Sequence, residues 1–258
     1  MKKQAFVLTV VLTTIFALAG PSGAWASVPF YNRLEQAVTR SDPAALGELR
    51  TVLRREAALL PDPPTGGSPL RAYTLAYVNS RLVPVLPDER KEERRKLLDE
   101  AAEALRQSLA IAPRDAEAHA LLGAIHGAQI GLTPWRAVTL GPRIAEAFRR
   151  AEELAPENPR VALQKGISLL FVPRAFGGGA EAAERELRRA EALFAREGRG
   201  KAWPNWGQVD VLAWLGQARA RQGDEKGARA LYQRALALAP GHVWITGELL
   251  PALGPAPR

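Results

Sequence analysis

Two histidines, His119 and His126, are the first candidates for chemistry in this chain, because histidine is a common ligand of transition-metal ions. They are seven residues apart, close to two helical turns, so on a helix they would share a face. A metal site needs a third ligand, and the nearby sequence offers none. His119 also falls at a position that normally packs in the core of a helical repeat. We therefore interpret both histidines as structural and predict no metal site.

Three consecutive glycines, Gly177, Gly178 and Gly179, could present free backbone amides to an anion if a helix follows them. A phosphate-binding P-loop would also need a lysine after the glycines and an apolar strand before them, and both are missing. We expect the glycines to form a flexible entry into a helix that begins near Ala180.

Acid–base catalysis would need paired carboxylates, and the candidate glutamates all lie among arginines at helical spacing, which predicts solvent-facing ion pairs. These glutamates are Glu146, Glu152, Glu153, Glu181, Glu184 and Glu186. The chain has no G-x-S-x-G motif of a serine hydrolase. It has no cysteine, which excludes a thiol nucleophile, disulfides and zinc–cysteine sites. The sequence thus predicts a protein that is not an enzyme and carries no cofactor.

The elements that hold these residues follow a repeat, most clearly over residues 209–242. Small and large apolar side chains recur there at the spacing of a helical hairpin of about 34 residues, closed by a proline. The residues that carry the pattern are Leu212, Leu215, Gly216, Ala228, Tyr232, Ala235 and Pro240. Such a hairpin cannot bury its apolar face alone, so the pattern predicts a stack of similar hairpins.

Weaker copies of the pattern precede the last one. The first spans about residues 70–113, the second 116–156 and the third begins at Asn158. The second copy has an insertion centred on residues 131–135, and the third has a long connection over 171–179. Before them, residues 30–60 read as two helices and 61–67 as a Pro/Gly-rich loop. The predicted fold is all-α, a short right-handed α-solenoid of helical hairpins with long intra-repeat loops.

From about residue 70 to 242 the chain resembles tetratricopeptide-repeat (TPR) proteins. More narrowly, it resembles exported bacterial TPR proteins of uncharacterised role. The residues that carry this resemblance are Asn158-Pro159-Arg160, Gly166-Ile167-Ser168, Pro173, Phe176-Gly177-Gly178 and Trp206-Gly207. A more distant resemblance is to the periplasmic TPR subunits that accompany some TRAP transporters. The resemblance implies a scaffold for contacts between proteins.

The N-terminus has the three parts of a secretory signal peptide: basic Lys2 and Lys3, an apolar run from Ala5 to Gly20, and the small-x-small site Ala24-Trp25-Ala26. The alternative is an uncleaved membrane anchor. We expect cleavage near Ala26 and a periplasmic or secreted product. No later stretch is long and apolar enough to span a membrane. The predicted domains are a signal peptide (1–26), an N-terminal helical segment with its loop (27–68), a TPR-like domain (69–250) and a flexible tail (251–258).

The formal charge of +8 falls to +6 once Lys2 and Lys3 are removed (8 − 2 = 6). Much of the excess is arginine on helices that also carry glutamate, so the charge is dispersed. We expect no nucleic-acid partner for an exported protein.

The family resemblance places a binding groove on the first helix of each hairpin. The groove positions of the third and fourth hairpins, with two tryptophans from the preceding loop, form the candidate partner-binding set: Arg160, Leu163, Ile167, Leu170, Phe171, Asp210, Gln217, Arg221, Trp203 and Trp206. Either an apolar segment of a partner binds in this groove, or loops of the chain fold into it and fill it. The tryptophans expected in loops, Trp135, Trp203 and Trp206, either cover the solenoid or form a stacking surface for a peptide or glycan.

The function predicted is a non-enzymatic exported scaffold that binds a protein or peptide, within an envelope complex. A second hypothesis is a TRAP-transporter-like periplasmic accessory that binds a small or lipid-like ligand in an apolar cavity. A third is a purely structural envelope protein.

Overall fold

The computed structural model describes residues 26–58, 68–197 and 203–254. The predicted signal peptide, the 61–67 loop and the end of the predicted tail lie outside the described residues. The described helices are α1 (Val28–Thr39), α2 (Pro43–Ala58), α3 (Pro69–Val85), α4 (Lys91–Ile111), α5 (Ala116–Leu132), α6 (Ala137–Leu154), α7 (Pro159–Phe171), α8 (Ala180–Glu197), α9 (Gln208–Arg221), α10 (Glu225–Leu238) and α11 (Leu250–Ala252). A π-helical turn, Ile245–Leu249, precedes α11. No strand occurs in this part of the chain.

Polar side chains begin several helices by accepting hydrogen bonds from backbone amides that have no partner within the helix. Asp115 accepts from Ala118 N–H at the start of α5. Asn158 does the same for α7, where Pro159 follows as the first helical residue. These caps begin the helices close to where the repeat pattern predicts them.

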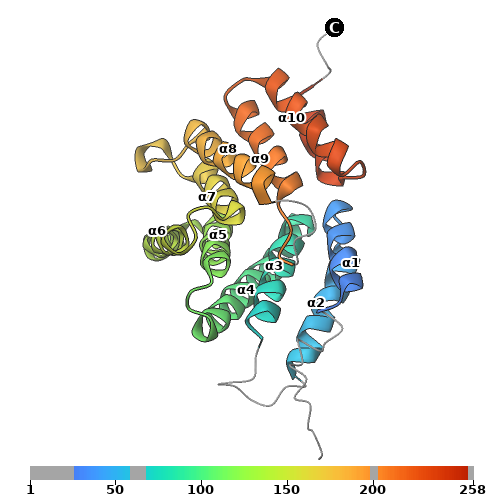
Figure 1. Ribbon diagram of the computed structural model, residues 1–258, viewed down its shortest axis with the longest axis vertical. Coiled ribbons are helices and arrows are strands. Elements are labelled where there is room, and N and C mark those ends of the chain that lie inside the picture. The colour runs from blue at the N-terminus through green and yellow to red at the C-terminus, as the bar shows by residue number, and fades with distance from the viewer. Residues whose placement is uncertain (1–25, 59–67, 198–202, 255–258) are drawn as a thin grey trace, which may run out of the picture.

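The helices pair as antiparallel hairpins, α3 with α4, α5 with α6, α7 with α8 and α9 with α10. The hairpins stack in order, with α4 against α5, α5 against α7 and α8 against α9 (Figure 1). We call α3, α5, α7 and α9 the inner helices. Helices α1 and α2 precede the stack, and α2 packs against α3. The predicted all-α solenoid of hairpins is confirmed.

Small residues let the two helices of each hairpin approach closely, as the repeat pattern predicts. A Cβ added at Gly216 would overlap the ring of Tyr232. A Cβ at Gly166 would lie 2.7 Å from Leu187 Cγ, and one at Gly123 would lie 3.1 Å from Phe148 Cε2. Each glycine of one helix therefore receives the large side chain of its partner.

The insertion in the second hairpin is mostly helical. Helix α5 continues to Leu132, a short 3-10 turn covers Pro134–Arg136, and α6 begins at Ala137. Pro134 is tolerated because it stands in the first position of that turn. The extra residues lengthen both helices of this hairpin. Helix α6 lies at the edge of the molecule, nearly end-on in Figure 1, with far less contact to α7 than α5 has.

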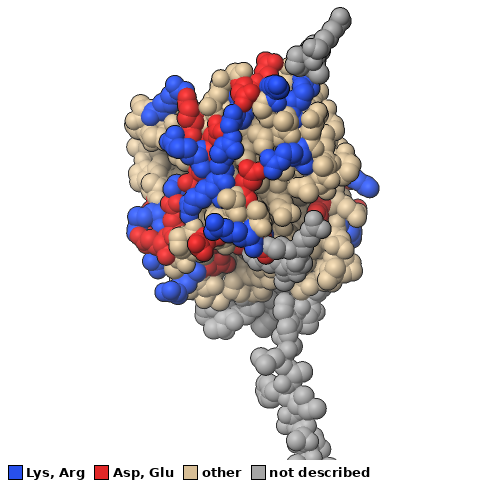
Figure 2. All heavy atoms as spheres, turned by 45° about the horizontal axis from the view of Figure 1, so that its top comes forward, with Lys and Arg blue, Asp and Glu red and all other residues tan. Residues whose placement is uncertain are grey.

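The six glutamates considered for acid–base chemistry all lie in ion pairs. Examples are Glu184 with Arg188 at 2.8 Å and Glu152 with Lys165 at 2.7 Å. Glu146 and Glu153 both pair with Arg149, Glu181 pairs with Arg174, and Glu186 with Arg189. Figure 2 shows basic and acidic side chains interspersed on one face. Their charges are therefore largely neutralised by neighbours, as the helical spacing predicts.

Candidate functional site

The segment after α8 returns to α3 and covers it. The Trp203 ring stacks on Tyr31 with centroids 4.7 Å apart, and its Nε1–H donates to Thr74 Oγ1 at 3.1 Å. The buried Trp206 donates from Nε1–H to the Tyr73 hydroxyl at 3.1 Å. For Trp203 and Trp206, the structure has the alternative in which the loop folds back onto the solenoid, whereas Trp135 is 75% exposed.

An ion pair joins the first inner helix to the last one. Arg81 of α3 donates two hydrogen bonds of 2.8 Å to the two carboxylate oxygens of Asp210 on α9. The guanidinium carbon of Arg81 also lies 4.9 Å from the ring centroid of Tyr77 and 5.5 Å from that of Trp206. Burial alone would lower the pKa of Arg81, but Asp210 and Tyr77 outweigh it and raise the pKa. We call this contact the Arg81–Asp210 clasp.

Arg160 has a structural position inside the stack. Its side chain is almost completely buried and donates to both Glu197 carboxylate oxygens, at 2.6 and 2.8 Å. The Glu117 carboxylate of α5 lies 3.7 Å away. Burial opposes the charge of Arg160, but these carboxylates prevail and raise its pKa. Arg160 thus ties α7 to α5 and α8.

The predicted partner-binding residues divide by accessibility. Those buried by the protein itself are Arg160, Leu163, Leu170, Asp210 and Trp206. Those partly or well exposed are Ile167, Phe171, Gln217, Arg221 and Trp203. In this structure, residues 203–207 and the clasp fill the part of the groove next to α3. The accessible part lies on α7 and α9.

A row of aromatic rings occupies that accessible part. Phe171 at the end of α7 meets Trp214 of α9 edge-on, with centroids 6.0 Å apart, and Trp214 meets Trp244 at 5.1 Å. The Arg221 guanidinium lies 4.9 Å from the Phe171 centroid and donates to the backbone oxygen of Leu170 at 2.8 Å. Phe171 is 62% exposed, and both tryptophans are half-buried. We call Phe171, Trp214, Trp244 and Arg221 the aromatic row.

From the sequence, Trp214 and Trp244 are expected to pack the last hairpin, so they are absent from the predicted binding set; both are partly buried against the core. The sequence did indicate that Trp214 belongs with the binding set, because it lies on the same helical stripe as three of its residues. Asp210, Trp214, Gln217 and Arg221 are spaced i, i+4, i+7 and i+11. Trp244 lies after the last repeat, so no repeat position could place it.

The three glycines after α7 do not form an anion site. Gly177 N–H donates to Arg174 O at 3.0 Å, Gly178 N–H to Pro173 O at 3.2 Å and Gly179 N–H to Leu169 O at 2.9 Å. Because all three amides are used by the turn itself, none is free for a ligand. The glycines are needed for the turn, since Gly177 and Gly179 have φ values of 82° and 100°.

The two histidines lie on the same helix, and both line a cleft between α4 and α6. His119 Nε2 is 3.1 Å from Pro113 O, and His126 Nδ1 is 2.8 Å from Gln129 Oε1. The described residues contain no cluster of three or more His, Cys, Asp or Glu side chains placed to hold a metal ion.

No protein-family model matches the chain, and no curated protein sequence matches it. Among solved structures, the HusA haemophore from Porphyromonas gingivalis superposes with a TM-score of 0.60 at 23% identity, covering 77% of this chain and 96% of that one. TTC0263, a thermophilic TPR protein of Thermus thermophilus, gives a TM-score of 0.59 at 20% identity, covering 86% of this chain and 98% of that one. The chain has a TPR-like helical fold. Within this fold, the aromatic row lies on the first helices of the third and fourth hairpins, α7 and α9, and on the segment that follows the fourth hairpin.

Proposed function

We propose that this protein is an exported, non-enzymatic TPR-like scaffold that binds a peptide segment of a partner protein in the bacterial envelope. The observation that carries the proposal is the aromatic row. Its rings have centroids 5.1 and 6.0 Å apart and form one continuous apolar strip on α7, α9 and the segment after α10. Exposed aromatic residues of this kind are enriched where proteins bind one another.

The charge at the end of the row favours an acidic residue in the partner. Arg221 makes no ion pair within the described part of the chain, although its neighbours on α8 and α9 are extensively paired. A carboxylate beside an aromatic or aliphatic side chain of the partner would satisfy Arg221 while the apolar group covers Phe171. The preferred partner is therefore a segment with an apolar residue next to Asp or Glu.

Two further observations support this function over its alternatives. The glutamates available for catalysis are held in ion pairs, which supports a role without chemistry. The transport-accessory hypothesis needs an apolar cavity, whereas the cleft between α4 and α6 has four arginines in its lining. The aromatic row is an accessible apolar surface on α7, α9 and the segment after α10.

Export rests on the N-terminal sequence, since residues 1–25 lie outside the described residues. In the described part, no helix combines the length and hydropathy that a membrane crossing requires. The test is N-terminal sequencing of the protein recovered from the bacterial envelope or medium. A first residue of Ser27 would support export with cleavage after Ala26, whereas an intact Met1 in the membrane fraction would contradict it.

The binding surface can be tested by site-specific photocrosslinking in cells. A photoreactive phenylalanine analogue at Phe171 should crosslink one stoichiometric partner. The same analogue at Val138, an exposed apolar residue of α6, a helix that carries no residue of the row, should not. Purified partner should then bind Phe171→Ser at least about tenfold more weakly than wild type, as expected for loss of an interface anchor. Equal crosslinking at both positions, or unchanged affinity of Phe171→Ser with native circular dichroism, would disprove the assignment.

A further inference from the structure

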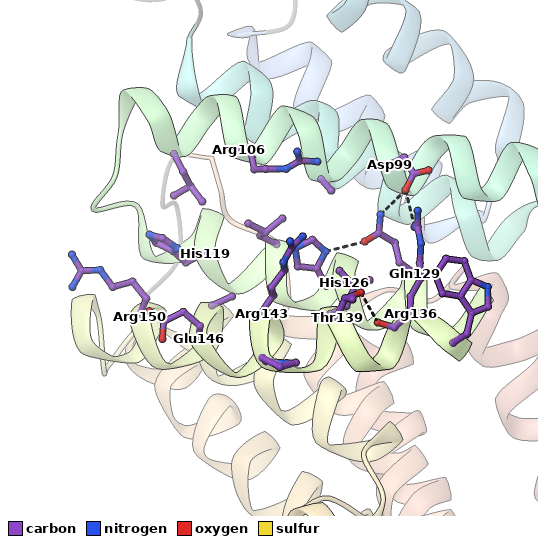
Figure 3. A pocket seen from close by; sticks show the side chains of 17 residues that line it. Asp99, Arg106, His119, His126, Gln129, Arg136, Thr139, Arg143, Glu146 and Arg150 are labelled. Carbon is purple, nitrogen blue, oxygen red and sulfur yellow. Dashed lines mark hydrogen bonds and ion pairs between the residues drawn. The ribbon is translucent and has the colours of Figure 1, made fainter. Parts of the chain in front are cut away.

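A cleft of about 980 Å³ lies between α4 and α6, with α5 as its floor (Figure 3). Both α4 and α6 pack on α5 but hardly contact each other, so a space remains between them. The volume is at the upper end of the range typical of small-molecule sites, about 300–1,000 Å³. The cleft is on the outer side of the second hairpin, on elements other than those of the aromatic row.

The side chains of the cleft carry an excess of positive charge. Arg106, Arg136, Arg143 and Arg150 line it together with Asp99 and Glu146, a formal excess of two positive charges (4 − 2 = 2). Much of this charge already has partners: Arg136 lies 3.0 Å from Asp99, Arg106 2.8 Å from Glu103 and Arg150 3.6 Å from Glu153.

Arg143 is the exception among these arginines. It makes no ion pair within the described residues, and the nearest acidic residue of its own helix, Glu146, pairs with Arg149. Figure 3 shows Arg143 rising from α6 toward His126, with Arg106 on the facing wall. The cleft therefore holds at least one guanidinium without a counter-charge.

His126 lies buried at the floor of the cleft in an oriented hydrogen-bond chain. Gln129 donates from Nε2 to Asp99 Oδ1 at 2.7 Å, so its Oε1 is the atom that faces His126 Nδ1 at 2.8 Å. Nδ1 must then carry the proton, and neutral His126 keeps its lone pair at Nε2. Arg136 closes the chain by binding the same Asp99 oxygen. Three residues, from α4, α5 and the 3-10 turn, thus fix the orientation of this histidine.

We propose that this cleft binds a small organic anion whose carboxylate or phosphate group pairs with Arg143 and Arg106. The apolar part of the ligand would lie against Leu109, Leu122 and Leu140, which also line the cleft. The proposal is independent of the aromatic row and of the peptide partner. Arginine suits this role because its planar group of donors matches carboxylate and phosphate oxygens.

Binding of the anion is coupled to protonation of His126. Burial lowers the pKa of His126, and Arg143, Arg106 and Arg136 lower it further, against the hydrogen bond to Gln129. The other charged or titratable groups that line the cleft are Asp99 on α4, His119 on α5, and Glu146 and Arg150 on α6. An anion offsets the field of the arginines, so the pKa of His126 rises when the ligand binds. Affinity then increases as the pH falls toward the histidine range.

The test is proton NMR of the histidine rings in the mature protein, which has only three histidines to assign. Inorganic phosphate and citrate are titrated separately, and the more tightly bound probe identifies the oxyanion class. The expected result is a saturable shift of the His126 resonances and a higher His126 pKa in the presence of the anion. Shifts that grow linearly without saturation for both probes would overturn the proposal.

Matched variants separate the cleft from general charge effects. Arg143→Gln and Arg106→Gln should each weaken the saturable binding at least about tenfold, the loss expected for one charge-assisted contact. Arg143 is exposed, so its variant keeps the fold. Arg185→Gln, an exposed arginine of α8 outside the cleft, is the control and should bind like wild type. Equal binding by Arg143→Gln and wild type would also overturn the proposal.

Discussion

Replacing Asp210 by alanine should destabilise the protein because it leaves Arg81 without its carboxylate. In the native structure the side chain of Arg81 is only 22% exposed and that of Asp210 only 11%. Breaking a buried pair by removing one partner costs about 3–5 kcal/mol, because the remaining charge stays away from water. Arg81 keeps some access to water and its contacts with Tyr77 and Trp206. We therefore expect Asp210→Ala to lower the free energy of unfolding by about 2–3 kcal/mol.

The loss is measured by urea denaturation followed by circular dichroism, together with the melting temperature. For a domain of this size, each kcal/mol corresponds to about 2–4 °C, so the melting temperature should fall by about 4–12 °C. The double variant Arg81→Met/Asp210→Leu removes both charges and should cost less than about 1 kcal/mol. This rescue distinguishes an unpaired buried charge from a simple loss of packing.

A surface pair of similar length provides the control. Arg33 and Glu48 lie 2.9 Å apart with side chains 58% and 70% exposed. Glu48→Ala should cost less than about 1 kcal/mol, because water and salt screen an exposed pair. If Asp210→Ala costs no more than Glu48→Ala, the clasp contributes nothing as a buried pair and our reasoning is refuted.

Four other variants test the packing and the titration of the core, all by urea denaturation. Gly216→Ala should lower the free energy of unfolding by about 1–3 kcal/mol because the added Cβ overlaps Tyr232. Gly127→Ala should raise it by about 0.5–1 kcal/mol, since no atom lies within 4 Å of the added Cβ. The opposite order would contradict the packing. Trp206→Phe keeps an aromatic ring but loses part of the buried indole and its hydrogen bond to the Tyr73 hydroxyl, so the free energy of unfolding should fall by at least about 1 kcal/mol; an unchanged midpoint would show that neither contributes. Folding lowers the pKa of His126 from 6.5, so the unfolded chain takes up the proton first and the free energy of unfolding of the wild type falls as the pH drops below that value. His126→Gln should therefore lose less stability than the wild type between about pH 7 and pH 5. Equal losses would contradict the lowered pKa.

The hairpins could be predicted from the sequence because their spacing is a local property. Gly216 and Tyr232 are sixteen positions apart, and the length of a helical hairpin alone brings them together. The same holds for the glutamate–arginine pairs one turn apart on α6 and α8. The structure of the insertion in the second hairpin was harder to predict, because Gly131 and Pro134 indicate a loop. Both residues are instead accommodated at the junction of two lengthened helices.

The candidate sites could be predicted only in part, because they depend on the curvature of the whole stack. Arg81 and Asp210 are 129 residues apart, and no spacing rule connects them. Phe171 and Arg221 of the predicted set are exposed, but which part of the predicted groove stays accessible depends on the path of residues 203–207. The cleft combines Arg106, His126 and Arg143 from three helices, and it exists because α4 and α6 pack on α5 without packing on each other.

The clasp also limits how this architecture can change in evolution and in engineering. An open array can gain or lose a repeat at little cost, because each repeat contacts only its neighbours. Here α9 must meet α3 after a fixed amount of superhelical rotation, so an added hairpin would carry Asp210 past Arg81. A deletion would leave Trp206 short of Tyr73. The number of hairpins between α3 and α9 is therefore set by the geometry of closure, and variation in length is confined to the ends of the chain and to the outer connections.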